Sequence, residues 1–432
     1  MRNTFSLLFL ISLILSTVSP LIAGGIDNKT NSSAEYIRTL SRNAATDSAD
    51  AVVYNPAGVM EMQNGTYINF PIQYIFKTYS NTVAGNVYAT ENPSIVPSLL
   101  LLHKRDQLAG YFAATVVGGG GKVDYKHGSA TTIGYGTLLA SNPALNPPYD
   151  IYKNQHVKAE SVYKGYLFGG AYKLNPMVSI LGIKCRASIS LGIRYVDAAQ
   201  SAKASLALDS SFVPAAPDML VTLDYEKEAD GLGGIIGLNL DLEGPLNIGI
   251  RYETGTNLNF ETTVNKDTVP NSATGDLFGG SGVTTGDEGR RDLPGILGIG
   301  AAYTASPNLR LDASLTYYFN TRADWEWEDR TDDDTTNGYD VGFSAEYTFN
   351  EKLKGSAGYM YTSTGIDPDH ILAEAPELDA HSIGYGILYK IKPNVDLNFG
   401  VLKVFYSDLK EAGVKYEKEV ATFAAGIQYK FD

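Results

Sequence analysis

The sequence contains very little cysteine and no long apolar run beyond its N-terminal segment. Cys185 is the single cysteine in 432 residues, so an internal disulfide is excluded. A membrane-spanning helix needs about 18 or more consecutive apolar residues, and none follows the N-terminal segment. The mean hydropathy of -0.11 is also low for a protein with several membrane-spanning helices. A helical membrane protein is therefore excluded, and the fold must be held by a large core or by another kind of membrane insertion.

The chain also lacks a basic excess and the usual catalytic motifs. Its net charge of -14 argues against nucleic acid as a partner. The five histidines show no metal-ligand spacing, no G-x-S-x-G motif occurs, and the neighbours His381 and Ser382 would point to opposite faces of a strand. We therefore expect no enzyme, no metal and no cofactor. The densest acidic run, residues 325–334, is either a solvated loop or a contact for divalent cations or lipopolysaccharide.

The first residues have the pattern of a secretory signal peptide. A positive end at Arg2 precedes an apolar stretch from Phe5 to Leu15, and Ala23 offers a small residue before Gly24. A retained membrane anchor is the alternative, but such anchors usually need about 20 apolar residues. We expect residues 1–23 to be removed and the rest of the chain to be exported.

Tyrosine and glycine are abundant, with 29 and 44 copies, and apolar residues alternate with polar ones. In one segment, one face carries Leu309, Leu311, Ala313, Leu315, Tyr317 and Phe319, and the other carries Arg310, Asp312, Ser314, Thr316, Tyr318 and Asn320. This period of two is that of a β-strand. About fourteen such segments occur, an even number as bacterial outer-membrane barrels require. They begin near Thr66, Ser94, Gln107, Ser161, Arg186, Met219, Pro245, Asp292, Asn308, Gly338, Lys352, Asp379, Asn394 and Tyr416.

The connections between these segments alternate in length. Short ones such as Glu243-Gly244 and Asn350-Glu351 alternate with long ones. The long ones cover residues 118–160, 199–218, 265–291, 322–337 and 363–378. Short periplasmic turns and long external loops are typical of outer-membrane barrels, and tyrosines near both strand ends would form two interfacial girdles. The sequence thus predicts an all-β fold, a transmembrane antiparallel β-barrel over residues 66–432 in a bacterial outer membrane.

Residues 24–65 precede the first strand and are too many for a simple tail. Short helices are predicted near residues 33–38 and 47–53, and Pro56 ends the second one because proline clashes with a preceding helical turn. Asn55 could cap the turn with its side chain, and Gly58 would let the backbone turn sharply. No further helix is predicted. This segment either folds into the lumen as a plug or forms only a turn that leads into the first strand.

The stretch "SRNAATDSADAVVYNPAGVMEM" resembles the hatch signature of the FadL/TodX-type outer-membrane transporters of long-chain fatty acids and hydrocarbons. The resemblance rests on Asn55, Pro56, Ala57 and Gly58 in the expected position, and extends to strand number and loop pattern. It implies a fourteen-stranded barrel with an N-terminal hatch. It also implies that apolar ligands enter from outside and leave sideways into the membrane near a kinked third strand.

The predicted third strand ends in four consecutive glycines, Gly118, Gly119, Gly120 and Gly121. Glycines weaken a strand and permit a bend, so this run is either the flexible start of a long loop or the place of the lateral opening. An apolar ligand path near it could use Leu99, Leu101, Tyr111 and Phe112.

Some predicted inward positions carry charge. Three arginines, Arg194, Arg251 and Arg310, share the inner face with acidic residues, namely Glu253, Asp312 and Glu346. A hydrated ladder of lumen side chains is the favoured interpretation. The alternative is that an arginine binds a ligand carboxylate through paired hydrogen bonds.

The favoured function is passive uptake of a hydrophobic compound, such as a long-chain fatty acid or an aromatic hydrocarbon, through a plugged barrel. The alternative is a structural or adhesive surface barrel whose acidic loops bind a partner. A water-filled porin conflicts with a plug of roughly forty residues. We expect a monomer that contacts outer-membrane lipid and lipopolysaccharide. The barrel assembly machinery should recognise the last strand, 420–431, although Asp432 follows the usual terminal aromatic residue.

Overall fold

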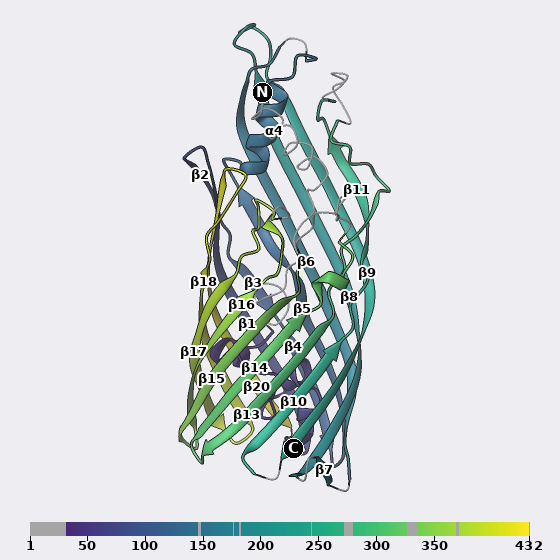
Figure 1. Cartoon of the computed structure of the whole chain (residues 1–432), viewed down its shortest axis with the longest axis vertical. Coiled ribbons are helices and arrows are strands. Elements are labelled where there is room, and N and C mark those ends of the chain that lie inside the picture. Colours follow the sequence, from purple (N-terminus) through teal and green to yellow (C-terminus); the bar gives the residue numbers. More distant parts are fainter. Residues whose placement is uncertain are drawn as a thin grey trace.

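The chain forms a tall β-barrel with a small helical segment inside it (Figure 1). The computed structural model describes residues 32–145, 148–175, 177–180, 183–242, 244–271, 280–325, 335–368 and 371–431. The predicted signal peptide at 1–23, the acidic residues 326–334 and His370 lie outside these residues.

Fourteen antiparallel strands form the wall within the described ranges. They are β1 (Gly65–Val83), β4 (Leu99–Arg105), β5 (Leu108–Tyr125), β6 (Ile151–Lys173), β8 (Ile183–Asp209), β9 (Met219–Leu242), β10 (Leu246–Glu253), β13 (Ile296–Ser306), β14 (Leu309–Tyr318), β15 (Gly338–Asn350), β16 (Leu353–Ser363), β17 (Ala380–Lys392), β18 (Val395–Tyr406) and β20 (Val414–Phe431). Shorter strands extend or edge the wall: β2 (Asn86–Glu91), β3 (Ser94–Pro97), β7 (Val178–Ile180), β11 (Asn259–Asp267), β12 (Glu288–Arg290) and β19 (Leu409–Glu411). The predicted fold class is confirmed.

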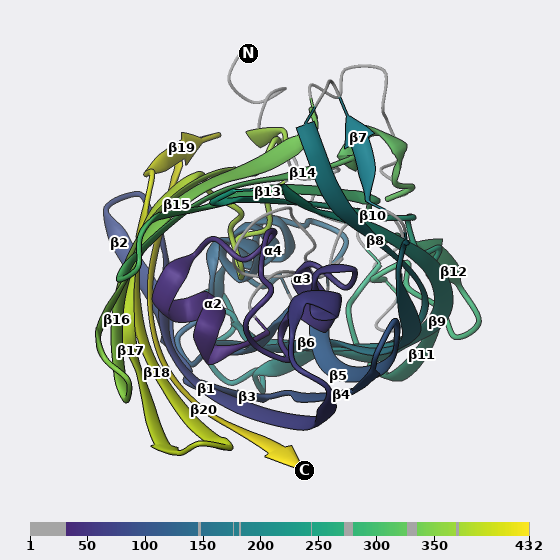
Figure 2. The same cartoon turned by 90° about the horizontal axis from the view of Figure 1, so that it is seen from below.

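The barrel closes because the first strand pairs with the last. β1 pairs with β20 from Thr66 opposite Phe431 to Val83 opposite Val414, and its other edge pairs with β2, β3 and β4. Figure 2 shows the resulting ring of strands from below. A closed ladder of this kind leaves no edge strand open at the seam.

Side chains alternate between a polar interior and an apolar exterior. On β1, Asn69 and Gln73 are 0% and 1% exposed, whereas Phe70 and Ile72 are 46% and 41% exposed. Exposed aromatic residues such as Tyr303 on β13 and Phe405 on β18 lie near opposite ends of the wall. This inversion of the soluble pattern, with aromatic residues at both borders, is typical of a barrel whose outer face contacts lipid.

No helix in the described part of the chain is long and apolar enough to cross a membrane.

The predicted strand starts agree with the structure within a few residues at most positions, but the first external loops were predicted too long. β5 continues through the glycine run to Tyr125, β6 begins at Ile151 rather than near Ser161, and β8 continues to Asp209. These segments keep their alternation beyond the lipid-facing belt, with polar instead of apolar outward residues. The prediction that no helix follows Pro56 is also wrong, since α4 (Ala130–Ala140) lies in the first of these loops.

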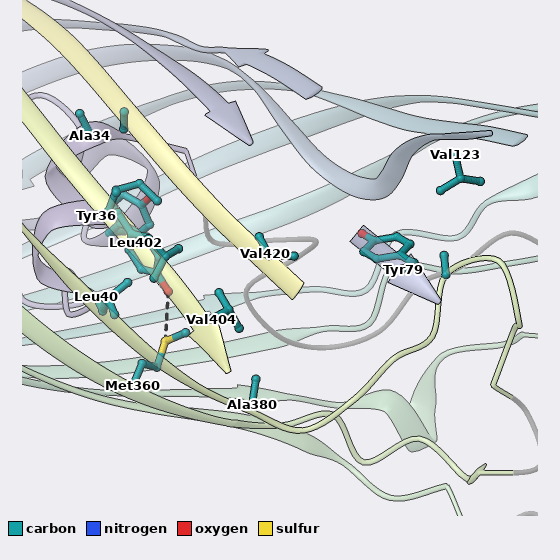
Figure 3. Packing of buried hydrophobic residues seen from close by; sticks show 14 of the residues in the cluster. Ala34, Tyr36, Leu40, Tyr79, Val123, Met360, Ala380, Leu402, Val404 and Val420 are labelled. Atoms are coloured by element: carbon teal, nitrogen blue, oxygen red, sulfur yellow. Dashed lines mark hydrogen bonds between the residues drawn. The ribbon is translucent and has the colours of Figure 1, made fainter. Parts of the chain in front are cut away.

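Inside the ring, residues 32–63 form the segment that we call the hatch (Figure 2). It contains the helices α2 (Ala34–Thr39) and α3 (Ala51–Tyr54) and the short 3-10 helix η1 (Gly58–Glu61). Ser33 caps α2 by accepting from the Tyr36 amide over 2.9 Å. In Figure 3, Tyr36 and Leu40 pack beside Leu402 and Val404, and the Tyr36 hydroxyl contacts the Met360 sulfur at 3.3 Å.

Candidate functional site

The Asn-Pro-Ala-Gly motif joins the hatch to the barrel wall. The Asn55 amide nitrogen donates to Asn239 Oδ1 on β9 over 2.8 Å and to the Ala45 carbonyl over 3.1 Å. Asn55 therefore ties the hatch to the wall, and the predicted capping role of its side chain is wrong. A Cβ at Gly58 would lie 2.2 Å from Asn55 Nδ2 and 2.5 Å from Ala45 O. Gly58 is thus required by close packing, whereas the sequence pattern predicted that it provides a sharp turn.

A buried ion pair fixes α2 to the opposite side of the wall. Arg38 is 0% exposed and pairs with Glu346 on β15. Its guanidinium also donates to Ser356 Oγ over 2.9 Å and to Asn398 Oδ1 over 3.0 Å. Breaking such a pair would leave a buried charge without compensation, which is strongly destabilising. The hatch is therefore docked by specific contacts on two sides of the lumen.

Glu35 is a second buried charge in the hatch. Its Oε1 accepts from Ser48, Asn69 and Asn398 at 2.8, 2.7 and 3.0 Å. Its Oε2 is buried with no hydrogen-bond partner. Burial, and after it the charge of the nearby Asp50, raises the pKa of Glu35. The docked hatch therefore favours the protonated carboxyl.

Glycines on the inner face of the wall make room for the hatch. A Cβ at Gly358 would lie 1.8 Å from the Thr39 carbonyl oxygen, and one at Gly384 would lie 2.3 Å from the Ile37 oxygen. Equally close approaches to hatch atoms occur at Gly249, Gly300 and Gly342. The sequence pattern alone did not single out these positions. Each of these glycines occupies an inward-facing position in the alternation of its strand. A search of the sequence for inward glycines could therefore have shown where the plug contacts the wall.

The three inward arginines are all held by acidic partners. Arg194 and Arg251 both pair with Glu253, and Arg310 pairs with Asp312 at 2.9 Å. Arg310 also donates to the Ala44 carbonyl of the hatch over 3.2 Å. The favoured interpretation, a ladder of lumen side chains, describes these contacts. The arrangement gives no support to an arginine reserved for a ligand carboxylate.

The glycine run bends β5. Its pairing with β6 shifts register between Val116 and Gly118 and again between Gly118 and Gly121. Gly119 has a φ of 89° and Gly121 a φ of 69°, which residues with a side chain rarely adopt. A Cβ at Gly119 would also lie 2.3 Å from the Ser161 carbonyl oxygen. The run is thus a double β-bulge in the third wall strand and not the start of a loop.

The wall is interrupted beside this bulge. β5 pairs with β4 from Leu108 to Ala114. Above that point, within the fully described residues 86–125, β5 has no ladder pairing with β3 or β2. β5 and β2 come together again further along, where the Asp124 amide donates to Thr90 Oγ1 over 2.9 Å. Pro93 and Pro97 flank the opposing stretch and have no amide hydrogen to donate to a neighbouring strand. A gap in the ladder therefore separates β3 from β5.

Two adjoining cavities meet at the glycine run. The first, which we call the chamber, has a volume of about 90 Å³ under α4 and is lined by apolar side chains such as Leu139, Leu206 and Val221. The second, the wall cavity, has a volume of about 300 Å³. Both cavities are lined in part by Gly120, Gly121, Glu160 and Ser161.

The wall cavity lies at the gap in the ladder and touches residues of both faces. Its lining includes the lumen residues Tyr79 and Val420, shown in Figure 3, which are 3% and 5% exposed. It also includes Ile95, which is 62% exposed on the outer face.

The residues of α4 that line the chamber are uncharged. Tyr135 of α4 lines it, and burial, followed by the influence of Asp267, raises the pKa of Tyr135 to about 12. The phenol therefore stays neutral at physiological pH. The end of α4 is tied down as well, since Ser129 contacts the Glu374 carboxylate and the Ala130 amide donates to Asn81 Oδ1 over 3.0 Å.

The structure places the four predicted path residues on both faces of the wall. Tyr111 points inward and packs against the hatch cluster. Phe112 lies on the outer face, where its ring is 4.8 Å from that of the 58% exposed Phe168. Leu101 pairs with Phe112, and Leu99 shares its face. Leu99 and Leu101 thus face outward, because the alternation of β4 turns Leu100 and Leu102 inward instead. The part of these residues in an apolar path stays a prediction.

Comparison with known proteins agrees with this architecture. The family model described as MetA-pathway of phenol degradation matches residues 282–408, under a third of the chain. No curated protein matches the sequence. Several solved structures, however, share its fold. The Pseudomonas putida toluene transporter TodX is 12% identical, with a TM-score of 0.61 over 90% of this chain and 96% of that one.

Two further structures extend the similarity. A Pseudomonas aeruginosa FadL homologue is 13% identical, with a TM-score of 0.66 over 95% of this chain and 100% of that one. The Ralstonia pickettii toluene transporter TbuX is 16% identical, with a TM-score of 0.57 over 88% and 93% of the two chains. This chain has the FadL/TodX-type fold. The resemblance seen at the Asn-Pro-Ala-Gly motif is thus confirmed at the level of the fold.

Within the FadL/TodX-type fold, the structure separates two sets of residues. Asn55 and its neighbours hold the hatch in the lower lumen, whereas Gly120 and Gly121 line both cavities. Nothing in the described residues forms a group of three or more metal-binding side chains.

Proposed function

We propose that this protein is an outer-membrane channel for passive uptake of hydrophobic small molecules, such as aromatic hydrocarbons or long-chain fatty acids. The observation that carries the proposal is an apolar chamber that adjoins a second cavity at the gap in the wall beside the glycine bulge. An apolar solute gains free energy with each part of its surface that leaves water, so it would enter the chamber readily. The named functions of the TodX and TbuX structures agree with this proposal.

The ligand leaves through the wall and not through the hatch. The hatch fills the lower lumen with buried ion pairs and close backbone contacts, whereas the wall cavity lies beside the chamber at the gap between β3 and β5. Residues 24–65 act as the hatch domain, with Asn55 to Gly58 as its anchor. The barrel, residues 66–432, works as a monomer in contact with lipid and lipopolysaccharide.

Uptake of radiolabelled toluene and oleate tests this function in cells whose only such channel is this protein. Ala202→Trp would fill the chamber, because Ala202 lines it and is 6% exposed. Ala199→Trp is the matched control, three residues earlier on β8 and exposed on the outer face. We expect uptake to fall at least roughly tenfold in the first variant only, since blocking a path costs more than adding a surface aromatic.

The outcome also separates the alternative functions. Wild-type uptake no greater than that of cells without the protein would contradict the channel and favour the structural or adhesive barrel. A large steady ionic current through single molecules in a planar bilayer would contradict it in favour of a water-filled porin.

A further inference from the structure

Lys77 lies on the lumen side of the gap in the wall. It belongs to β1, is 7% exposed, and lines the wall cavity together with Tyr79 and Ser94. A lysine is rarely so deeply buried unless its ammonium group has a partner. The contacts of this side chain therefore indicate what it does there.

The Lys77 ammonium group donates to the carbonyl oxygen of Gly120. The double bulge makes this carbonyl accessible, because the pairing of β5 with β6 passes from Gly118 to Gly121 without including Gly119 or Gly120. The Tyr79 ring centroid lies 5.5 Å from the same nitrogen and adds a cation-π contact. Lys77 thus connects β1 to β5 across the stretch where β3 and β5 are not paired.

Gly121 leaves the space that this contact needs. A Cβ at position 121 would lie 3.1 Å from the Lys77 nitrogen and 2.9 Å from Ser94 Oγ. The backbone there has a φ of 69°, so glycine meets both the steric and the conformational requirement. The glycine at position 121 therefore allows the Lys77 ammonium group to reach the bulge.

We propose that Lys77 is a latch that restrains the lateral opening by holding the glycine bulge of β5 against β1. The proposal rests on the proposed function, because it assigns a residue that controls the exit of the ligand. A hydrogen bond from a charged donor in a poorly solvated site is strong. Widening the gap requires β5 to move outward, and this movement breaks the bond between Lys77 and Gly120. The latch limits the rate of exit without contributing to the binding of the ligand.

Two variants release the latch from opposite sides. Lys77→Met keeps the length of the side chain and removes the donor, whereas Gly121→Ala displaces the ammonium group sterically. For radiolabelled toluene, both should raise the initial uptake rate by roughly ten- to hundredfold, the range expected for loss of one hydrogen bond to a charged group. Lys77→Arg, which keeps the charged donor, should stay near the wild-type rate.

Lys403→Met on β18 is the matched control. Lys403 is a half-exposed lysine outside the wall cavity, with its nitrogen 3.7 Å from Glu419. Its rate should equal that of the wild type. An unchanged rate in both latch variants would overturn the proposal. A lower rate in Lys77→Met would also overturn it, because it would show that Lys77 binds the ligand.

Amide hydrogen exchange tests the latch independently of transport. In Lys77→Met, amides of residues 118–122 should exchange at least roughly threefold faster than in the wild type, because the bulge loses its tether. Amides of the β15–β16 pair should not change. Equal exchange at 118–122 would overturn the latch even if the wild type transports toluene. Faster exchange in a protein that fails to transport toluene would support the latch and count against the proposed function alone.

Discussion

The side-chain amide of Asn55 in the hatch donates to Oδ1 of Asn239 on β9 over 2.8 Å. Both residues are 0% exposed. Asn239 also exchanges hydrogen bonds with Asn247 on β10, at 2.9 and 3.0 Å. The hatch motif is therefore part of a buried amide network that includes two strands of the wall, and its replacement should loosen the hatch without opening the barrel.

Asn55→Ala should weaken hatch docking by about 1–3 kcal/mol, because it leaves the buried Asn239 oxygen with one donor fewer. The barrel should still assemble, since its closed ladder does not include the hatch. Limited proteolysis of the hatch measures docking, and gel mobility with and without boiling measures assembly. Asn308→Ala, in an exposed turn, is the control. Equal protection of the hatch in Asn55→Ala would contradict the anchor.

Gly358→Ala should displace α2, because its new methyl group would lie 1.8 Å from the Thr39 carbonyl oxygen. Overpacking of this kind typically costs about 1–3 kcal/mol. Gly110→Ala is the control, since a Cβ there meets nothing within 4 Å. Hydrogen exchange of the α2 amides should rise in the first variant and not in the second. Slow exchange in both would mean that the hatch does not press on the wall at Gly358.

Hatch docking should depend on pH through Glu35. Burial and Asp50 raise the pKa of Glu35 in the docked hatch above its ordinary value of about 4.3. Docking is therefore strongest below that ordinary value and weakens as pH rises through the raised pKa. Glu35→Gln should remove this dependence and keep the accepting oxygen for Ser48, Asn69 and Asn398.

Asp47 does not explain the same pH window. Burial works to raise the pKa of Asp47, but Arg42 and Arg310 outweigh it and hold that pKa well below its usual range. Its contribution is lost only in strong acid. Protection factors of the α2 amides, measured from roughly pH 4 to pH 8, separate the two groups. Protection that falls equally in wild type and Glu35→Gln would rule out Glu35 as the titrating group.

Deletion of Tyr429 to Asp432 should impair assembly. It removes the pairs of Thr66, Tyr67 and Ile68 with β20, which close the barrel at the end with short turns, and it removes part of the strand that is predicted to carry the assembly signal. Deletion of Asp432 alone leaves Phe431 at the end and should assemble at least as well as the full chain. The measurement is the heat-modifiable fraction at the cell surface. Normal assembly of the longer deletion would show that the signal lies elsewhere.

Strand pairing and the fold were readable from the sequence because alternation over ten or more residues records which face contacts lipid. The start of β15 at Gly338 and of β9 at Met219 were predicted to the residue. The bend of β5 at the glycine run was harder to predict from the sequence. The four glycines indicated a weak point in β5, but the bulge contacts Ser161 and Lys77, which lie far away in sequence.

The path residues show the limit of reasoning from proximity in sequence. Leu99, Leu101 and Phe112 are near the bulge but point to the outer face, because a single-residue difference in position reverses the direction of a strand side chain. The chamber was missed because it is built from α4, β8 and β9, which come together only through tertiary packing. The alternation of β1 indicates that Lys77 faces inward. Its proposed role as a latch depends on the gap beside β3, which the sequence did not show.

Photolabelling tests the central claim most directly. A radiolabelled aryl-diazirine hydrocarbon, activated on the protein in outer-membrane vesicles, should modify chamber residues such as Leu206 and Val221 and wall-cavity residues such as Val96 and Val420. Excess unlabelled toluene should suppress these modifications and leave those at the lipid-facing Leu191 and Ile193. Labelling confined to the outer belt, or lumen labelling that toluene does not reduce, would contradict a path from the chamber through the wall.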